Sequence, residues 1–236
     1  MELQDPGLLR QAALIGGEWI EANGSGIAVT NPSTGAVIGH VPRLGRAETA
    51  RAIAAAATAQ KDWAARPAKE RADILRRWFD LMTAHKQDLG RILTAEQGKP
   101  LAEAVGEITY GASFIEWFAE EARRVYGDTI PGHQRDKRIL VLKQPIGVVA
   151  AITPWNFPNA MITRKAGPAL ASGCAMVLKP ASQTPFSAIA LAVLAERAGL
   201  PAGLFSVVTG SAVEIGAEMT ANPVVRQLTF PGSTQI

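Results

Sequence analysis

The segment from Ala151 to Ser187 constrains the fold more than any other part of the chain. Just before and within it lie two apolar runs, Ile146 to Ile152 and Cys174 to Leu178. The spacing predicts a helix between them, from about Pro158 to Leu170, and a further helix after Pro185. Strand, helix and strand in this order form a βαβ unit, which presents ligand-binding residues at the carboxyl ends of its strands.

Polar residues stand where these predicted strands end. Asn156 follows the first strand, and its carboxamide is a neutral donor of the kind that stabilises an oxyanion. Lys179 ends the second strand, so its ammonium could reach a ribose or a phosphate lying across the strand end. Each residue has a structural alternative: Asn156 could bond its own backbone in an Asx-turn, and Lys179 could be a solvent-facing surface lysine.

The remaining elements follow from apolar periodicity. Up to about Val125 a short strand region precedes helices, and apolar stripes at intervals of three and four predict that their aromatic residues belong to the core. A first helix is expected over Glu48 to Ala65. A second is expected to start at Pro67 and to carry an apolar stripe of Ile74, Leu75, Trp78, Phe79 and Met82. A third is expected over Pro100 to Val125, with a stripe of Ile108, Phe114, Ile115 and Phe118. Beyond Pro145, strands near Val148, Met176, Ser206 and Leu228 are expected to alternate with helices near Met161, Ile189 and Ile215.

Composition favours an intracellular α/β protein. The 236 residues are 47% hydrophobic and 19% charged, and the net charge is only +3. Apolar runs fall short of the ~18 residues of a membrane span, and the start lacks a signal-peptide pattern, so we expect a cytoplasmic protein with no membrane partner. The densest basic cluster, Arg135 to Arg138, is interrupted by Asp136 and is read as a solvated hairpin tip, which argues against nucleic-acid binding.

Cysteine and histidine content excludes several kinds of site. Cys174 is the single cysteine, it begins an apolar strand, and it is read as a buried core residue and not as a nucleophile. The three histidines, His40, His85 and His133, lack metal-ligand spacing, so no metal is predicted.

Several strings resemble the NAD(P)-dependent aldehyde dehydrogenase superfamily. They are PWNFP at Pro154, KPASQTP at Lys179 and FPGST at Phe230, with IGGEWI, NPSTG and EQGKP (Glu96 to Pro100) extending the resemblance over nearly the whole chain. The run NFPNAMITRKAGPALASGC is most similar to NADP-dependent succinate-semialdehyde dehydrogenases. The resemblance implies an α/β fold with a Rossmann-type parallel sheet flanked by helices, truncated before the catalytic domain. It divides the chain into an amino-terminal helical part (residues 1–125), an oligomerisation arm (126–145) and an incomplete NAD(P)-binding region (146–236).

The resemblance also assigns roles to residues. Asn156 would hold the oxyanion as the catalytic asparagine, and the cofactor would contact Thr153, Pro154, Trp155, Asn156, Lys179, Pro180, Ala181, Ser182, Gly232 and Ser233. Family members that prefer NAD tend to carry glutamate at the position of Ser182, so serine beside Lys179 points to NADP, with NAD possible. A G-x-G-x-x-G fingerprint is absent after the first strand, and the family's alternative turn at Gly232-Ser233 is weakened by Pro231, which removes a backbone donor.

Arg164 is the residue that suggests a substrate. It lies in the predicted helix after Asn156, where a guanidinium could hold a carboxylate in bidentate fashion. By resemblance it would bind the acid end of succinate semialdehyde. The alternative is a structural ion pair.

The implied activity is oxidation of an aldehyde through a covalent thioester, in a homo-oligomer. In the family the nucleophilic cysteine and the general-base glutamate follow the string matched by FPGST, so this chain is expected to be inactive alone. Two other interpretations stay open: a non-catalytic nucleotide-binding or assembly module, and the product of a truncated gene.

Overall fold

The centre of the protein is a six-stranded sheet. The computed structural model describes residues 1–24 and 26–232. The strand order is β10-β7-β8-β9-β1-β2. The strands are β1 (Ala12–Ile15), β2 (Glu18–Glu21), β7 (Val148–Ile152), β8 (Ala175–Lys179), β9 (Phe205–Val207) and β10 (Val225–Thr229).

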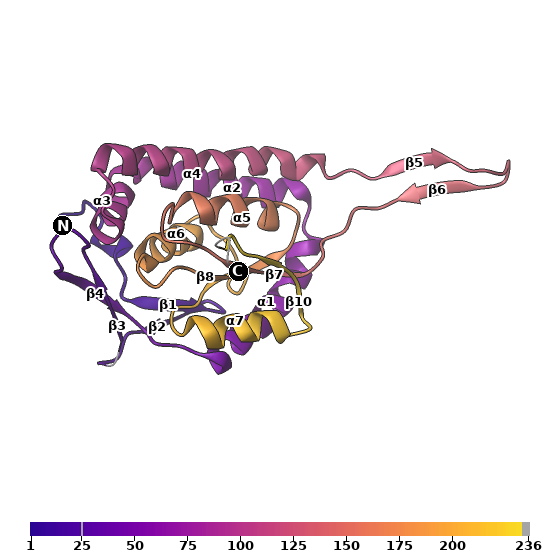
Figure 1. The fold of residues 1–236 in the computed structure, drawn as a ribbon. Helices are drawn as coiled ribbons and strands as arrows, with labels where there is room; N and C mark the ends of the chain where they lie inside the picture. Colours follow the sequence, from indigo (N-terminus) through magenta and orange to yellow (C-terminus); the bar gives the residue numbers. More distant parts are fainter. Residues whose placement is uncertain (25, 233–236) are drawn as a thin grey trace.

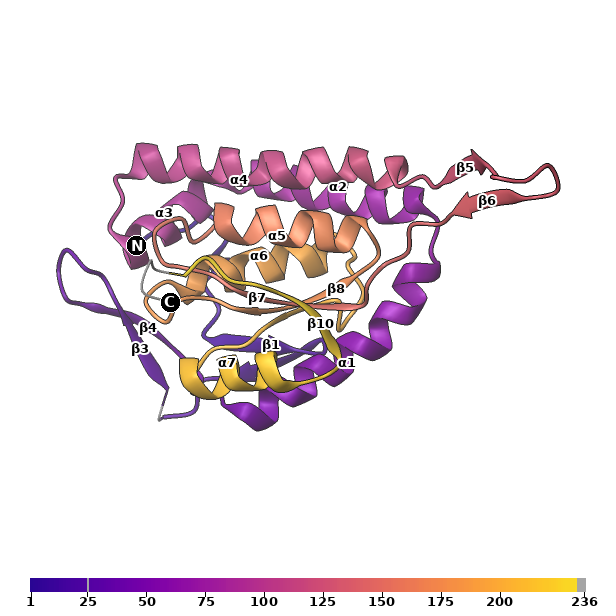
Figure 2. The same ribbon diagram turned by 45° about the vertical axis from the view of Figure 1, so that its right-hand side comes forward.

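Helices cover both faces of this sheet. They are α1 (Arg46–Ala65), α2 (Ala68–Ala84), α3 (Lys86–Gln97), α4 (Leu101–Glu121), α5 (Ala160–Ala171), α6 (Pro185–Arg197) and α7 (Ala212–Ala221). Figures 1 and 2 show α5 and α6 on one face and α1 and α7 on the other, with α2 and α4 forming a further layer over α5 and α6. The α/β class predicted from the sequence is confirmed.

The predicted βαβ unit is present at the middle of the sheet. β7 and β8 pair in parallel with Val148 opposite Ala175 and Ile152 opposite Lys179, and α5 connects them. Every residue of β8 is buried, because helices cover both faces of a parallel sheet. The strand is accordingly apolar up to Lys179 at its end. The strands predicted near Ser206 and Leu228 are β9 and β10, both parallel to their neighbours in this unit.

The strands β10-β7-β8-β9 form the predicted parallel sheet, and two further strands make the complete sheet mixed. β1 pairs antiparallel with both β9 and β2, so the amino-terminal hairpin completes one side of the sheet. Gly16 and Gly17 form its turn with φ of 63° and 92°, which only glycine adopts without strain. A Cβ on Gly17 would also lie 2.5 Å from the Ala202 Cβ. Short apolar runs such as AALI do not encode strand direction, so the sequence did not indicate the antiparallel addition of β1.

The amino-terminal helices bury the predicted stripes. Ile74, Leu75, Trp78 and Met82 of α2 are buried in the main core. The prediction missed α3, which is separated from α2 only by His85 and ends at Gly98, whose φ is 86°. On α4 the stripe residues Ile108 and Ile115 are buried, whereas the aromatic residues Phe114 and Phe118 are only partly buried, and Phe118 packs against the core.

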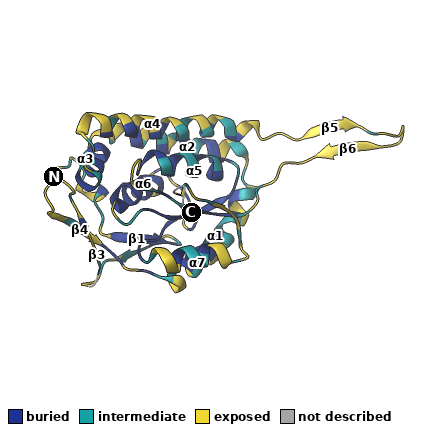
Figure 3. Ribbon diagram, viewed as in Figure 1, coloured by how far each residue is buried: buried dark blue, intermediate teal, exposed yellow. Residues whose placement is uncertain are grey.

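A two-stranded arm extends from the body of the protein (Figures 1 and 3). β5 (Asp128–Pro131) and β6 (Arg138–Val141) pair antiparallel, and every residue of both strands is exposed. The tip carries Arg135 to Arg138, as the sequence predicted for a solvated hairpin. A second small sheet is formed by β3 (Ile27–Thr30) and β4 (Val37–Val41), and short 3-10 helices span Pro6–Leu8 and Ala122–Arg124.

The predicted division at residues 125 and 146 stays a prediction. Strands from residues 1–125 and from 146–236 share the same sheet, so the two segments form one structural unit. In the described part of the chain, none of the helices has the length and apolar character needed to cross a bilayer.

Candidate functional site

The predicted site segments meet at one edge of the sheet. Because β7, β8 and β10 are parallel, their carboxyl ends lie side by side, with Ile152 opposite Lys179 and Ala151 opposite Thr229. The Thr153 N–H donates to the Lys179 carbonyl at 3.1 Å, which ties the first segment to the second. Ligands of open α/β sheets bind in the crevice beyond such strand ends.

Asn156 lies in the turn between β7 and α5. The side chain is exposed, and its Oδ1 accepts the Phe157 N–H at 3.1 Å, which is the kind of local bond expected of a turn residue. Its Nδ2 group has no hydrogen-bond partner among the described residues. The local bond therefore uses the oxygen and leaves the donor free, so the turn role and the oxyanion role are compatible.

Two residues hold this turn, one from the loop between α3 and α4 and one from α4. Lys99 Nζ donates to the Asn156 carbonyl at 3.2 Å, and it lies 4.0 Å from the centre of the Phe157 ring. The same ammonium pairs with Glu107 Oε2 at 2.5 Å. Glu107 Oε1 accepts the N–H groups of Asn159 and Ala160 at 3.0 and 3.2 Å, so it caps the start of α5.

Lys179 is buried, with 4% of the residue exposed, which rules out the solvent-facing alternative. Its Nζ donates to the Pro180 carbonyl at 2.9 Å and to Ser182 Oγ at 3.4 Å. Burial lowers the pKa of this ammonium below its usual value. No carboxylate pairs with it in the described part of the chain, so a buried cation and a neutral hydroxyl face this edge together. This donor set fits an anionic group such as a nucleotide phosphate.

A buried carboxylate supports the same loop from behind. Glu96 of α3 accepts the N–H groups of Phe186 and Ser187 at 2.7 and 2.8 Å, at the first turn of α6. Thr184, at the N-cap position, makes no side-chain capping bond, so Glu96 supplies the acceptors that the helix start needs. Burial raises the pKa of Glu96 to about 8.

Arg164 lies on the first turns of α5 and forms no ion pair in the described part of the chain. Its Nη2 donates to Tyr110 Oη at 3.1 Å and its Nε to the Ala160 carbonyl at 3.3 Å. The guanidinium carbon is 5.0 Å from the centre of the Phe114 ring, a cation–π distance. The ion-pair alternative is therefore not seen, and the guanidinium charge is available to a ligand.

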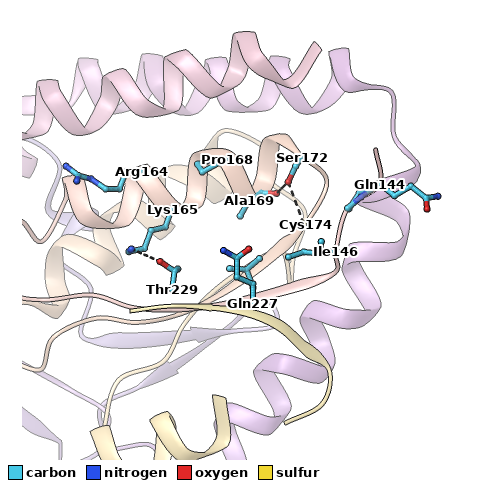
Figure 4. Close-up of a pocket in the computed structure, with 12 residues that line it drawn as sticks. Gln144, Ile146, Arg164, Lys165, Pro168, Ala169, Ser172, Cys174, Gln227 and Thr229 are labelled. Carbon is cyan, nitrogen blue, oxygen red and sulfur yellow. Dashed lines mark hydrogen bonds between the residues drawn. The ribbon is translucent and has the colours of Figure 1, made fainter. Parts of the chain in front are cut away.

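A cavity of about 510 Å³ lies between α5 and strands β7 and β10 (Figure 4). Of the described residues predicted for the site, only Arg164 lines it, so this cavity is distinct from the strand-end crevice. In Figure 4 Lys165 points toward Thr229, to whose Oγ1 it donates at 2.8 Å, while Arg164 is directed away from that pair. Cys174 also lines the cavity and is buried, as the sequence predicted.

The predicted glycine turn is described only in part. Pro231 and Gly232 follow β10 at the same sheet edge, where a Cβ on Gly232 would lie 3.0 Å from the Phe230 ring. Ser233 lies outside the described residues.

Comparison with known proteins decides the family. The model of the aldehyde dehydrogenase family matches residues 19–236. The chain belongs to the aldehyde dehydrogenase family. It is 69% identical over 237 aligned residues to the glutarate-semialdehyde dehydrogenase of Pseudomonas aeruginosa, covering 100% of this chain and 49% of that protein. It is 68% identical to the NADP-dependent succinate-semialdehyde dehydrogenase of Escherichia coli, with the same coverage.

Solved aldehyde dehydrogenase structures have the same fold. A crystal structure of an NADP-dependent enzyme from Escherichia coli matches with a TM-score of 0.95 and 68% identity, over 96% of this chain and 47% of that one. The chain thus spans about half, 49%, of the length of the curated relatives it matches. The resemblance read from the strings PWNFP, KPASQTP and FPGST is confirmed.

Sequence reasoning missed the three residues that hold the site from behind. Lys99 and Glu96 lie in the EQGKP string, which was matched to the family without a role. Glu107 had a readable signal, because it lies on the buried face of α4 with Ala104, Ile108 and Gly111. A glutamate on the apolar face of a helix is predicted to be paired or hydrogen-bonded, since buried charges have such partners.

Proposed function

We propose that this chain forms the cofactor-binding part of an NADP-dependent dehydrogenase that oxidises a semialdehyde carrying a carboxylate, such as succinate semialdehyde, to the dicarboxylic acid. The observation that carries the proposal is the sheet edge itself. There the free Nδ2 donor of Asn156 follows β7, and the buried cation of Lys179 with Ser182 follows β8. A neutral donor and an unpaired cation at neighbouring strand ends suit an oxyanion and a phosphate.

Lys179 and Ser182 would bind the cofactor. Their ammonium and hydroxyl groups supply donors without a carboxylate, which favours a ribose 2'-phosphate over free ribose hydroxyls. The name of the Escherichia coli relative specifies NADP, which supports the same choice, and NAD remains the alternative. When bound, the nicotinamide accepts the hydride of the aldehyde. Thr153, Pro154, Trp155, Pro180, Ala181, Gly232 and Ser233 complete the proposed contact set.

Asn156 and Arg164 would act on the substrate. Asn156 Nδ2 would donate to the aldehyde oxygen as negative charge develops on it, and the Arg164 guanidinium would hold the distal carboxylate. Both relatives are named for semialdehydes of dicarboxylic acids, which carry such a carboxylate. Cys174 is buried beneath α5 and is not proposed as the nucleophile. We propose that the nucleophile and the general base come from outside residues 1–236.

A chimera tests this function directly. Residues 1–236 replace the matching half of the Escherichia coli relative, with which they share 68% identity, and NADPH formation from succinate semialdehyde is followed. We expect robust turnover, and a drop in kcat of about 100- to 1,000-fold in Asn156→Ala, the usual cost of losing one oxyanion donor. An inactive but folded chimera would favour a non-catalytic nucleotide-binding module instead.

Assembly and location are also proposals. The exposed β5–β6 arm carries apolar side chains, including Ile130, Ile139 and Leu140, and we propose that it pairs with further copies of the chain in a homo-oligomer. The cytoplasm remains the expected compartment.

A further inference from the structure

The turn that carries Asn156 is held by contacts from the α3–α4 loop and from α4. Lys99 lies between α3 and α4 and donates to the Asn156 carbonyl, 57 residues away in the chain. Glu107 lies on α4 and accepts N–H groups of Asn159 and Ala160 on the other side of the turn. The two side chains are joined by their own ion pair. We call Lys99 and Glu107 the clamp.

Because this ion pair is buried, its stability depends on its geometry. Only 12% of the Lys99 side chain and 1% of the Glu107 side chain are exposed. Removing two charges from water costs several kcal/mol for each ion, and only good geometry with further hydrogen bonds offsets that cost. The further hydrogen bonds here all go to the turn, so the geometry of the pair and the geometry of the turn depend on each other.

The close approach of α4 to the turn that carries Asn156 also restricts the position of this turn. Asn159 is fully buried, and a Cβ on Gly111 would lie only 2.1 Å from its Oδ1. Gly111 follows Glu107 by one turn of α4, so the same helix face both caps the turn and gives it room. Small displacements of this face would therefore move the turn.

We propose that Lys99 and Glu107 are positioning residues that set the direction of the Asn156 amide donor. The proposal rests on the proposed function, in which that donor stabilises the developing oxyanion. Hydrogen bonds fix the chain that directly follows the Asn156 side chain, at the Asn156 carbonyl and at the start of α5. An oxyanion donor works only when it is aimed before the reaction begins, and misplacement by about 1 Å can cost on the order of 100-fold in rate.

The clamp variant is Lys99→Met combined with Glu107→Gln in the chimera. Lys99→Met alone would leave a buried unpaired carboxylate and could unfold the protein, whereas the double change removes both charges and keeps an acceptor for α5. The matched control is Lys69→Met with Asp73→Asn, an ion pair of the same 2.5 Å length on the exposed face of α2. We expect kcat to fall about 10- to 100-fold in the clamp variant and to stay unchanged in the control.

A double-mutant cycle with Asn156→Ala separates positioning from general structural damage. If the clamp acts through Asn156, its effect on kcat should largely disappear in the Asn156→Ala background, while the KM for NADP stays within a factor of about two. An equal fall in kcat in both backgrounds would overturn the proposal. So would an unchanged kcat in the clamp variant.

Hydrogen exchange gives a readout that does not need activity. In the chimera without ligands, the N–H groups of Phe157, Asn159 and Ala160 are expected to exchange faster in the clamp variant than in the control. When Lys99→Arg takes the place of Lys99→Met, protection is expected to be restored in part. Unchanged exchange would refute the clamp even in an active enzyme. An inactive wild-type chimera with the expected exchange difference would count against the proposed function and not against the clamp.

Discussion

The Glu96 carboxylate accepts the Ser187 N–H at 2.8 Å, across 91 residues of sequence. Glu107 makes the equivalent contact with Asn159 at 3.0 Å. Each glutamate comes from the amino-terminal helices and caps the helix that follows one of the two site loops. Both helices that follow the site loops are thus capped by these two glutamates, while the hydrogen-bond partners of Lys179 are the Pro180 carbonyl and Ser182 Oγ.

Residues 1–236 alone should not form NADPH from succinate semialdehyde. The single cysteine, Cys174, has 3% of its surface exposed and cannot approach a substrate at the strand-end crevice. The assay compares the wild-type chain with Cys174→Ala. NADPH formation that is lost in the variant would show that this thiol is the nucleophile.

Arg164→Ala in the chimera should raise the KM for succinate semialdehyde far more than the KM for an uncharged aldehyde of similar length. A hydrogen bond to a charged group contributes about 1.5 to 3 kcal/mol, so a change of about 10- to 100-fold is expected. Arg164→Lys is the control, since it keeps the charge without the planar fork. Equal changes for both aldehydes would exclude carboxylate binding by Arg164.

Ser182→Glu should shift the preference of the chimera from NADP toward NAD. The carboxylate would repel the 2'-phosphate and would accept hydrogen bonds from free ribose hydroxyls, an effect of about 1 to 3 kcal/mol. Lys179→Ala should weaken both cofactors, and NADP more strongly. The measurement is kcat/KM for each cofactor, and an unchanged ratio in Ser182→Glu would show that this loop does not read the 2' position.

Glu96 should make the stability of the chain fall as pH rises. Burial raises the pKa of its folded-state carboxyl from 4.5 to about 8, so between these values the folded protein binds a proton that the unfolded chain has released. Stability then decreases with pH by up to about 1.4 kcal/mol per unit and levels off above the folded pKa.

The variant Glu96→Gln removes this titration. Urea unfolding across the pH range should show the stability of wild type, relative to Glu96→Gln, declining between pH 4.5 and about 8. Glu70→Gln, at the exposed start of α2, is the matched control for the loss of one glutamate. Parallel curves for all three proteins would mean that Glu96 keeps one charge state throughout.

The sequence predicted those parts of the site that lie in contiguous strings. Asn156 comes four residues after one buried apolar run and Lys179 ends the other, so the order of residues along the chain already locates them near strand ends. The contacts of Lys99 and Glu96 could not be predicted in this way, because they join residues 57 and 90 positions apart and depend on how α3 and α4 pack on α5 and α6.

The errors in the fold have a similar cause. The boundary between α2 and α3 consists of His85 alone, with φ of −96° and ψ of 14°, and no proline or glycine marks it. The antiparallel direction of β1 depends on its pairing with Val207 of β9, which no local pattern records. Local sequence therefore predicted the candidate site residues, and packing between distant segments determines which residues support them.

The amino-terminal hairpin affects how the protein folds while it is being synthesised. Gly16 at its turn donates to Ser206, 190 residues further along, so one side of the sheet has no neighbour until β9 leaves the ribosome. At a translation rate of about 5 to 20 residues per second, that interval lasts roughly 10 to 40 seconds. During it, the buried residues Ala13, Leu14 and Ile15 are open to solvent and to other nascent chains. The order of synthesis thus leaves the hairpin without its β9 neighbour throughout that interval.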